Sequence, residues 1–247
     1  MSASLRARAR SGDRLLGVLL RMPAEELVEM AAVAGYDFIL MDCEHGPADV
    51  VALRQHMALA EAHGVPVLVR VGEGDDAAIL RVLDQGAQGV VVPHLDSDED
   101  ARRAVAAAHY PPVGHRGFAT YSRAGRFGTR DAAEHRDWFL QNTLVIGMIE
   151  SPLGVSAASA IIATPALDGI MVGPSDLAAS SGPDDPPPAV ATGQVHVELA
   201  RAGSLRMDIV GSPEAAARAF ADGAGIVVYN LAHVLMAHLR SALDARS

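Results

Sequence analysis

Short apolar runs alternate along the chain with longer segments of helical periodicity. The runs are rich in Val, Ile and Leu, and the alternation continues nearly to the C-terminus. This pattern is typical of repeated βα units, whose parallel strands are buried on both faces. It predicts eight strands, over Leu15–Leu20, Phe38–Asp42, Pro66–Val71, Gly89–Pro93, Val145–Glu150, Gly169–Val172, Met207–Val210 and Gly225–Val228.

The segments that follow these runs show the spacing of amphipathic helices. Several begin beside a polar capping residue, such as Ser97 or Ser212, and end near a glycine, such as Gly35. The pattern predicts helices over Ala24–Ala34, Val50–His63, Asp75–Gln85, Asp98–Ala107, Gly154–Ile162, Pro188–Ala202, Pro213–Asp222 and Leu231–Ala245. Two connections, His109–Asn142 and Ala178–Pro188, depart from the regular spacing.

Eight strands alternating with helices predict a (β/α)₈ barrel, the TIM-barrel fold. The length of 247 residues is the usual size of one such barrel. Half of the residues are apolar and only 4% are aromatic, which suits buried parallel strands covered by Ala-rich helices. The βα rhythm resumes after both irregular connections, so we predict a single domain over residues 1–247.

The charge of the chain excludes some classes of partner. It carries 20 basic and 30 acidic residues, a formal net charge of −10, without a basic stretch interleaved with aromatics, so a nucleic-acid partner is not expected. No apolar run reaches the roughly 18 residues that span a membrane, and Met1–Arg14 lacks an apolar signal core. We therefore predict a cytoplasmic protein, and the lone Cys43 is consistent with a reducing compartment.

All 20 basic residues are arginine, and the chain has no lysine. A Schiff base, the attachment of pyridoxal phosphate and a P-loop lysine are therefore excluded. Gly72-Glu73-Gly74 is only a fragment of a dinucleotide motif, so no nucleotide cofactor is expected. Carbanion chemistry in this chain would need a metal ion.

Chemically capable side chains follow several of the predicted strands. In a (β/α)₈ barrel the reacting groups come from the carboxyl ends of strands, so these side chains are expected at one rim. They are Asp42 at the end of strand two, Glu44 and His45 after it, Arg70 in strand three, His94 after strand four, Glu150 in strand five and Asp176 after strand six.

Glu150 and Asp176 are the candidate metal ligands. Two carboxylates on adjacent strands suit Mg²⁺, Mn²⁺ or Co²⁺, with positions left open for substrate and water. A 2-oxo acid bound through its carboxylate and keto oxygens would be polarised for enolate formation. The alternative is that Glu150 caps the next helix and Asp176 is a solvated loop residue.

His45 and Arg70 are the candidate catalytic base and the candidate cation for the enolate oxygen. Their alternatives are a structural histidine and an interstrand salt bridge. Asp42 and Glu44 flank His45 and are placed to orient it or to hold metal-bound water, and Asp42 is the stronger candidate. Gly173-Pro174-Ser175 would present backbone N–H groups to a substrate carboxylate.

These residues belong to a larger set of motifs that resembles a known family. The motifs are Asp42-x-Glu44-His45-Gly46-Pro47, Val69-Arg70-Val71, Gly86-Ala87-Gln88-Gly89-Val90-Val91-Val92-Pro93, Arg116-Gly117, Ser122-Arg123-Ala124, Ile149-Glu150 and Val172-Gly173-Pro174-Ser175-Asp176-Leu177. Together they resemble the class II, metal-dependent pyruvate aldolases of the HpcH/HpaI family. That family includes the 4-hydroxy-2-oxoheptanedioate and 2-dehydro-3-deoxyglucarate aldolases. The resemblance covers nearly the whole chain and is weakest over Ala178–Arg206.

The resemblance implies roles for individual residues. Glu150 and Asp176 become the metal ligands, His45 the base and Arg70 the enolate-stabilising cation. Asp84 matches an aspartate that assists the base near a subunit contact. The resemblance also implies a homo-oligomer, a hexamer or a trimer, whose subunits exchange the last helix of the barrel.

The chain departs from the family pattern at the substrate site. Met148 stands where relatives commonly carry a Gln near the metal, and a thioether accepts hydrogen bonds only weakly. Tyr229-Asn230 stands where many relatives carry an acid. Arg116, Arg123 and Arg126 fit either an acidic or phosphorylated distal group of the substrate or a role as solvated loop residues.

The leading hypothesis is a carbon–carbon lyase that reversibly cleaves a 4-hydroxy-2-oxo acid to pyruvate and an aldehyde through a metal-bound enolate. One alternative uses the same enolate for oxaloacetate decarboxylation, a citrate-synthase-like condensation or another biosynthetic carbon–carbon bond. A second alternative is a non-catalytic barrel subunit.

Overall fold

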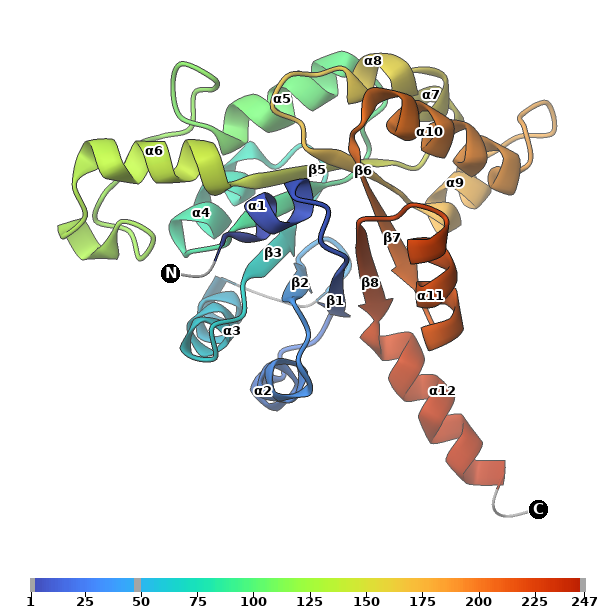
Figure 1. The fold of residues 1–247 in the computed structure, drawn as a ribbon, viewed down its shortest axis with the longest axis horizontal. Coiled ribbons are helices and arrows are strands. Elements are labelled where there is room, and N and C mark those ends of the chain that lie inside the picture. The colour runs from blue at the N-terminus through green and yellow to red at the C-terminus, as the bar shows by residue number, and fades with distance from the viewer. Residues whose placement is uncertain (1–2, 47–49, 245–247) are drawn as a thin grey trace.

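The computed structural model describes residues 3–46 and 50–244, so Pro47 of the motif after strand two lies outside the described residues. Eight parallel strands close into a barrel in chain order, which confirms the predicted fold (Figure 1). The strands are β1 Leu15–Leu20, β2 Phe38–Asp42, β3 Val67–Arg70, β4 Gly89–Val92, β5 Leu144–Ile149, β6 Gly169–Val172, β7 Leu205–Val210 and β8 Ile226–Asn230.

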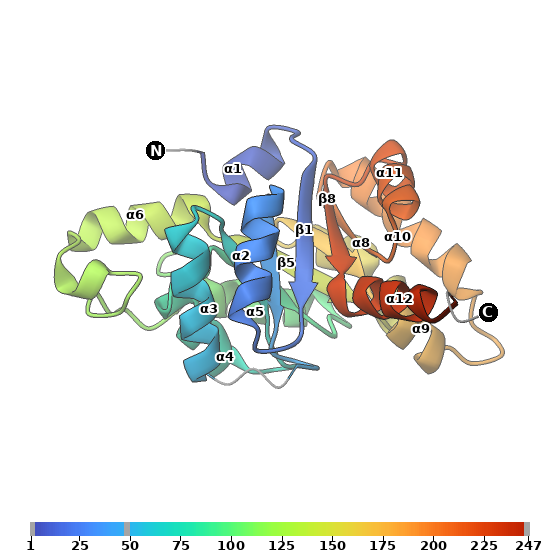
Figure 2. The ribbon, with the colours of Figure 1, turned by 90° about the horizontal axis from the view of Figure 1, so that it is seen from below.

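Helices surround the barrel and cover its outer face (Figures 1 and 2). They are α1 Leu5–Arg10, α2 Glu25–Ala34, α3 Val50–Ala62, α4 Asp76–Asp84, α5 Asp98–Ala108, η1 Arg126–Gly128, α6 Ala132–Asn142, α7 Pro152–Ser156, α8 Ala158–Ile162, α9 Pro174–Ser180, α10 Pro188–Ala202, α11 Pro213–Ala221 and α12 Leu231–Leu243. Ser97, Asp75 and Ser212 accept hydrogen bonds from backbone N–H groups in the first turns of α5, α4 and α11.

The barrel interior is filled by alternate residues of the strands. Because successive side chains of a strand point to opposite faces, residues two apart share the interior. A separate apolar cluster is formed in this way by Leu15, Leu19, Phe38, Leu40, Leu68, Val91, Leu144, Ile146, Met148, Met171, Met207, Ile226 and Val228, together with Leu5 and Ala9 of α1. Gly17 leaves room for the Phe38 ring, which lies 2.5 Å from where a Cβ of residue 17 would stand. The interior is therefore a packed core.

Helix α1 closes the amino-terminal end of the barrel. Its Leu5 and Ala9 join the interior cluster, and its Arg6 is buried. Arg6 Nε donates to Asp168 Oδ1 at 2.8 Å, and Arg10 Nη2 donates to the same oxygen at 2.7 Å. The other oxygen of Asp168 accepts the backbone N–H of Val145 at 2.9 Å. One buried carboxylate thus ties α1 to the starts of β5 and β6.

The structure corrects the predicted elements at several places. The helices α1, α6 and α9 and the short 3₁₀ helix η1 were not predicted, and α6 occupies the end of the His109–Asn142 connection. Of these, α1 and α6 have only a narrow buried face, which in α6 consists of His135 and Phe139, so their apolar periodicity is weak. The helix predicted over Gly154–Ile162 is two short helices that meet at Ala157. The strand ends move by two residues or fewer.

Helix α12 extends away from the barrel instead of folding back over it (Figure 1). None of its residues is buried, and Met236, Leu239 and Leu243 are exposed. On α2, Met30 and Val33 are exposed as well. The chain therefore presents apolar side chains on a projecting helix and on one helix of the barrel wall.

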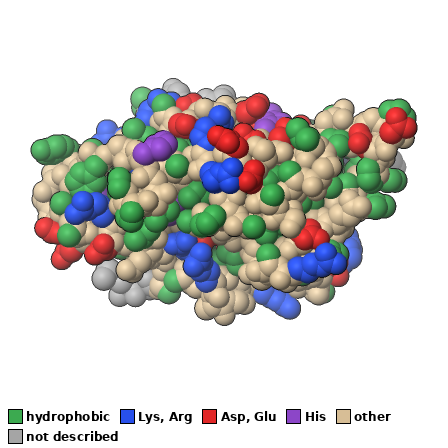
Figure 3. All heavy atoms as spheres, turned by 90° about the horizontal axis from the view of Figure 1, so that it is seen from above, with side chains coloured by type: hydrophobic (Ala, Val, Ile, Leu, Met, Phe, Trp, Pro, Cys, Tyr) green, Lys and Arg blue, Asp and Glu red, His purple; other side chains and the backbone are tan. Residues whose placement is uncertain are grey.

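The surface carries mixed charges. On the face drawn in Figure 3, acidic and basic side chains are interspersed among apolar ones, and basic side chains form no continuous stripe there. Among the described residues, no helix combines the length and the apolar character that a membrane crossing requires.

We predict that Asp168→Ala lowers the free energy of unfolding by about 3–5 kcal/mol, because it leaves the buried Arg6 without its carboxylate. Urea unfolding of the two proteins measures the difference. The matched control is Asp98→Ala, which removes an exposed ion pair with Arg102 and should cost less than about 1 kcal/mol. Equal losses in the two variants would contradict the role assigned to Asp168.

Candidate active site at the carboxyl end of the barrel

The interior rows of apolar residues end in polar residues at the carboxyl ends of the strands. Each polar residue lies two positions after a member of the interior cluster, so it shares that side of the strand. Asp42 follows Leu40, Arg70 follows Leu68, and Glu150 follows Met148 in this way. Arg21 and Asn230 follow Leu19 and Val228 by the same spacing. The barrel mouth is therefore lined by charged and amide side chains above an apolar floor.

Asp42 and Arg70 form a buried pair on neighbouring strands, whose register aligns the two residues. Arg70 Nε donates to Asp42 Oδ1 at 2.9 Å, and Arg70 Nη2 donates to Oδ2 at 2.5 Å. Arg21 Nε also donates to Oδ2, at 2.8 Å. Burial opposes ionisation of Asp42, but the hydrogen bonds and the charge of Arg70 outweigh it and hold the pKa of Asp42 below its ordinary value.

Asp42 also shapes the turn that follows β2. Its Oδ1 accepts the backbone N–H groups of Glu44 at 3.2 Å and of His45 at 3.3 Å. The carboxylate thereby holds both its own strand end and the next two residues. Asp42 therefore contacts the backbone of the segment that carries His45, and its role in orienting the His45 side chain stays a prediction.

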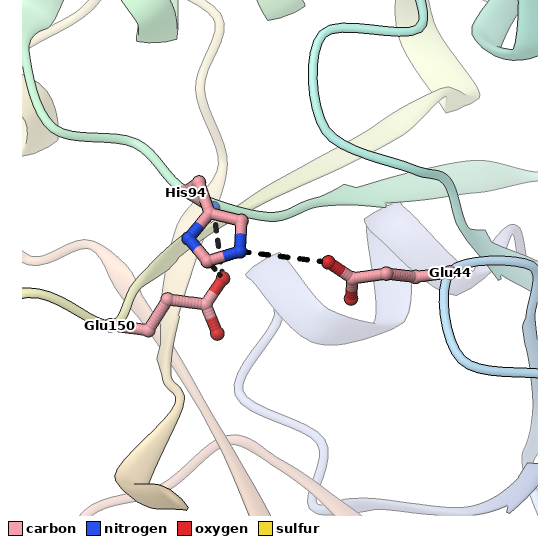
Figure 4. A group of neighbouring side chains, drawn as sticks. All are labelled: Glu44, His94 and Glu150. Atoms are coloured by element: carbon pink, nitrogen blue, oxygen red, sulfur yellow. Dashed lines mark hydrogen bonds and ion pairs between the residues drawn. The ribbon is translucent and has the colours of Figure 1, made fainter. Parts of the chain in front are cut away.

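Glu44, His94 and Glu150 meet beside this pair, as Figure 4 shows. One ligand atom of each lies within 4.8 Å of the others. His94 Nδ1 is 3.5 Å from Glu150 Oε1, and His94 Nε2 is 3.8 Å from Glu44 Oε1. Arg70 Nη1 lies 3.1 Å from Glu44 Oε2, so the arginine joins this cluster to Asp42.

The two glutamates of this cluster resist ionisation. Burial raises the pKa of Glu150, and the nearby negative charges of Glu44 and Asp176 raise it further. Burial also raises the pKa of Glu44, against the opposing charge of Arg70. The buried Glu44 Oε2 accepts no hydrogen bond within the described chain. Hard oxygen donors, an imidazole and surplus negative charge fit a divalent cation.

His94 has an unusual backbone conformation. Its φ is +52°, in the left-handed region that histidine seldom occupies. This conformation accompanies a hydrogen bond from its backbone N–H to Glu150 Oε1 at 2.9 Å. Strain of this kind, of about 1–3 kcal/mol, is found at sites where the surroundings enforce it. Here the turn after β4 fixes one oxygen of Glu150.

A cavity of about 390 Å³ opens at the same rim. Its lining includes the predicted site residues His45, Arg70, Met148, Gly173, Pro174, Ser175 and Asp176. Asp176 lies in the first turn of α9, and its charge acts on Glu150. Met148 is buried, with its sulfur 4.0 Å from Arg70 Nη1.

Gly173 is required for the close approach of α9 to Glu150. A Cβ at residue 173 would lie 2.3 Å from Glu150 Oε2. Only glycine lets the backbone before Pro174 pass so near the carboxylate. The motif Gly173-Pro174-Ser175 therefore brings α9 and its Asp176 against the end of β5.

His45 lies at the edge of the candidate site, whereas Asp84 does not line its cavity. The His45 side chain is 53% exposed, and its Nε2 is 3.9 Å from Glu44 Oε2, so it lies at the open edge of the cluster. Asp84 ends α4, a helix that runs back toward the amino-terminal end of the barrel, and it does not line the cavity. Asp84 Oδ1 instead accepts from Arg116 Nη2 at 2.6 Å. Within one chain, Asp84 is not brought to the other predicted residues.

The three loop arginines are held by the protein itself. The Arg116 side chain is buried, with its guanidinium 4.7 Å from the centre of the Tyr110 ring and 4.5 Å from that of Phe139. Arg123 pairs with Glu61 and donates to the carbonyl oxygen of Gln85, and Arg126 pairs with Glu61. The reading of Arg116 as a solvated loop residue is wrong.

Three residues of the rim were underrated or missed at the level of the sequence. Glu44 was ranked below Asp42, His94 was noted only as a strand-end residue, and Arg21 was not considered. The spacing of two from Leu19 is a signal in the sequence that identifies Arg21 as an interior rim residue. His94 gave no such signal, because its position depends on a turn.

Comparisons with a family model and with curated proteins both relate this chain to aldolases. The family model described as HpcH/HpaI aldolase/citrate lyase matches residues 16–230. A curated 5-keto-4-deoxy-D-glucarate aldolase of Salmonella arizonae is 44% identical over 158 residues. That alignment covers 62% of this chain and 59% of the relative, so this chain matches less than two thirds of the relative's length.

Solved structures match over almost the whole chain. An HpcH/Hpal aldolase/citrate lyase family protein from Burkholderia cenocepacia J2315 is 30% identical, with a TM-score of 0.87, over 98% of this chain and 99% of that one. The citrate synthase SbnG is 26% identical, also with a TM-score of 0.87, over 98% of this chain and 97% of that one.

We predict that Glu150→Gln stabilises the metal-free protein by roughly 0.5–2 kcal/mol at pH 8. Glu150 has a raised pKa in the folded state, so its contribution to stability is lost as the pH rises through that value. The side-chain amide of the Glu150→Gln variant would still accept the hydrogen bond from the His94 N–H. Because the amide is neutral, it does not lower the stability as the pH rises. The gain should therefore shrink toward pH 5.

Thermal unfolding in the presence of a chelator measures this pH dependence. Glu99→Gln, which changes an exposed acid on α5, is the matched control and should show no such trend. A Glu150→Gln variant that is less stable than the wild type at every pH would contradict the repulsion inferred here.

Proposed function

Because this chain belongs to the HpcH/HpaI aldolase/citrate lyase family, we propose that it is a divalent-metal-dependent aldolase. It cleaves a 4-hydroxy-2-oxo acid to pyruvate and an aldehyde, and it catalyses the reverse addition. The observation that carries this proposal is the cluster of Glu44, His94 and the buried Glu150, beside the Asp42–Arg70 pair, at the mouth of a barrel without lysine. The named activity of the Salmonella relatives supports it.

Glu150 and Asp176 are the proposed metal ligands. Glu150 belongs to the cluster with Glu44 and His94, whereas Asp176 lines the cavity and acts on Glu150 from the other side. A divalent cation bound there would supply a Lewis acid for the keto group of a 2-oxo acid. Mg²⁺, Mn²⁺ and Co²⁺ all fit oxygen ligands of this kind.

Arg70 is the residue proposed to stabilise negative charge on the keto oxygen. Its Nε and Nη2 are held by Asp42, and its Nη1 faces Glu44 and Met148. The guanidinium is therefore fixed before substrate arrives, so its charge needs no reorganisation during the reaction. Preorganised donors of this type contribute about 2.7–4 kcal/mol to a transition state.

His45 is the proposed general base. It lines the cavity, and its exposed imidazole gives a proton a path to solvent. In the cleavage direction it takes the proton of the 4-hydroxyl group while the bond between C3 and C4 breaks. It returns a proton to C3 of the pyruvate carbanion before release. The Asp42 contact to its backbone N–H positions the segment.

The sequence motif Gly173-Pro174-Ser175 predicts backbone donors for the carboxylate of the oxo acid, but the Gly173 N–H donates to the carbonyl oxygen of Ile149 at 3.0 Å and Pro174 has no N–H. The backbone N–H of Ser175 is therefore the proposed donor of this motif. Met148 covers the floor of this position with a buried thioether. A neutral, weakly accepting side chain there leaves Arg70 Nη1 without a strong protein acceptor on that side. Arg70 Nη1 lies 3.1 Å from Glu44 Oε2 on one side, so the side that faces Met148 is the one proposed to face the substrate.

A second candidate function is condensation of the same carbanion with an oxo-acid or acyl acceptor. The observation that favours it is the similarity to the citrate synthase SbnG over 98% of the chain. The two functions share every residue named above and differ in the acceptor. Products identified by mass from pyruvate or oxaloacetate with each acceptor distinguish them.

A homo-oligomer is proposed for the working enzyme, a hexamer or a trimer. Helix α12 buries none of its own residues, and its exposed Met236, Leu239 and Leu243 need a partner surface. Exchange of this helix between subunits would supply that surface. The assembly would also decide whether Asp84 of one chain approaches the site of another.

We predict that the purified protein with Mn²⁺ or Mg²⁺ releases pyruvate from a 4-hydroxy-2-oxo acid and that a chelator abolishes the release. Glu150→Ala should lower kcat/KM at least about 100-fold, and Arg70→Lys about 10–100-fold, because the lysine cannot keep the fork to Asp42. A coupled pyruvate assay measures all three. Full activity of Glu150→Ala, or full activity in the chelator, would refute the metal-dependent mechanism.

We predict that the wild-type protein is an oligomer and that the double variant Met236→Asp, Leu239→Asp breaks it into smaller species. Two charges on the apolar side of α12 would have to be buried in the exchange contact. Light scattering after size exclusion measures the mass. The control is Ser241→Asp, which adds a charge at an exposed polar position of the same helix; a monomeric wild type would sink the exchange proposal.

A further inference from the structure

A second cavity, of about 190 Å³, lies at the amino-terminal end of the barrel. Its lining includes Val65, which precedes β3, and Gln88, which precedes β4. Part of the segment 123–130 and Trp138 of α6 complete it. The cavity at the carboxyl end of the barrel shares no lining residue with it. This amino-terminal cavity is therefore separate from the proposed aldolase site.

One part of the lining is apolar and aromatic. It consists of Met57, Val65, Val67, Trp138 and Phe139. The rings of Trp138 and Phe139 meet edge to face, with their centres 5.0 Å apart. A dry apolar cavity of about 150 Å³ is already large enough to bind benzene. The volume and the apolar lining therefore fit one flat ring.

The rest of the lining carries surplus positive charge. Arg123, Arg126 and Arg130 line the cavity, and Glu61 is the one acid in its lining. Arg123 and Arg126 both pair with Glu61. Arg130 forms an ion pair with none of the described residues, and its guanidinium lies 5.5 Å from the centre of the Trp138 ring. A guanidinium without a carboxylate partner, stacked on an aromatic ring, is suited to bind an anion.

The turn that carries Arg126 is strained. Arg126 and Phe127 have φ values of +53° and +54°, in the left-handed region that residues other than glycine seldom adopt. Two backbone hydrogen bonds hold this turn, from Phe127 N–H to Ser122 O at 3.1 Å and from Gly128 N–H to Thr120 O at 2.8 Å. Strain of this kind clusters at functional sites. Here it accompanies the placement of a cation in the lining of the cavity.

Gln88 adds an unsatisfied polar group to the same lining. Its buried Oε1 has no hydrogen-bond partner among the residues that the structure describes. A buried acceptor without a donor is unfavourable, so it marks a place where a bound molecule or an ordered water completes the hydrogen bonding.

From these observations we propose that the amino-terminal cavity binds a small aromatic anion. One flat ring packs against Trp138 and the apolar lining, and a carboxylate or phosphate group on that ring pairs with Arg130 and Arg126. Arg130 is the main anchor, because no described carboxylate competes for it. The proposal goes beyond the aldolase function and requires no metal ion, so either one can fail while the other holds.

Trp138 is the only tryptophan of the chain, so its fluorescence reports on this cavity. Phenyl phosphate and benzoate are titrated into the whole protein in the presence of a chelator. At least one of them should change the Trp138 emission with a Kd of about 1 mM or tighter, and should raise the unfolding temperature. Inorganic phosphate and phenol, which each offer half of the ligand, should bind at least about tenfold more weakly.

Two arginine variants on neighbouring positions locate the anion. Arg130→Gln should weaken binding of the aromatic anion at least about tenfold, because it removes a charge-assisted contact. The matched control is Arg136→Gln on α6. Arg136 also stacks on a ring, 5.7 Å from the centre of Phe118, but it does not line the cavity, so its variant should bind like the wild type.

Arg126→Gln is a second test that leaves the contact between Arg130 and Trp138 in place. The Arg126 side chain is 63% exposed, so this change should weaken binding without a loss of folded structure. An unchanged Trp138 emission with both aromatic anions overturns the proposal. So does an affinity that neither arginine variant lowers, or binding of inorganic phosphate as tight as that of phenyl phosphate.

Discussion

The site depends on an excess of buried negative charge at the carboxyl end of the barrel. Asp42 and Glu150 are buried, the Glu44 side chain is 10% exposed, and Arg70 is a buried cation among them. Asp42 is satisfied by Arg70 and Arg21, but Glu44 and Glu150 are left with raised pKa values. A stability-optimised barrel would not retain such a pair. A bound cation would remove the repulsion between these carboxylates, so the unfavourable charge distribution itself favours cation binding.

The barrel can tolerate this unfavourable charge because the interior positions of its strands form two layers with different roles. The lower interior positions are apolar and form a packed core, closed at the bottom by α1 and its Arg6–Asp168 pair. The uppermost interior positions carry the chemistry. The two layers share a strand and a side, so the core fixes the direction in which each functional side chain points. The packed core below the site therefore holds the functional side chains in fixed directions.

This division also explains what the sequence could predict. The rule that reacting groups come from the carboxyl ends of barrel strands placed Asp42, Arg70 and Glu150 at one rim. In the structure Arg70 bonds to Asp42, and the charge of Glu150 acts on Arg70. His94 lies beyond its strand in a left-handed turn, and no periodicity encodes that conformation. Glu44 was named as a candidate from the sequence, but the closeness of Glu44 to His94 depends on the same turn. Helices α1 and α6 were missed because their buried faces are too narrow to produce a clear pattern.

Asp42 orders two guanidinium groups at the barrel mouth. Its Oδ2 accepts from both Arg70 Nη2 and Arg21 Nε, so the two arginines converge on one buried oxygen. The position of Arg70 is therefore set by a carboxylate on β2 before any substrate binds. Because the charge of Arg70 is already in place, little reorganisation is needed when negative charge develops on a bound oxo acid.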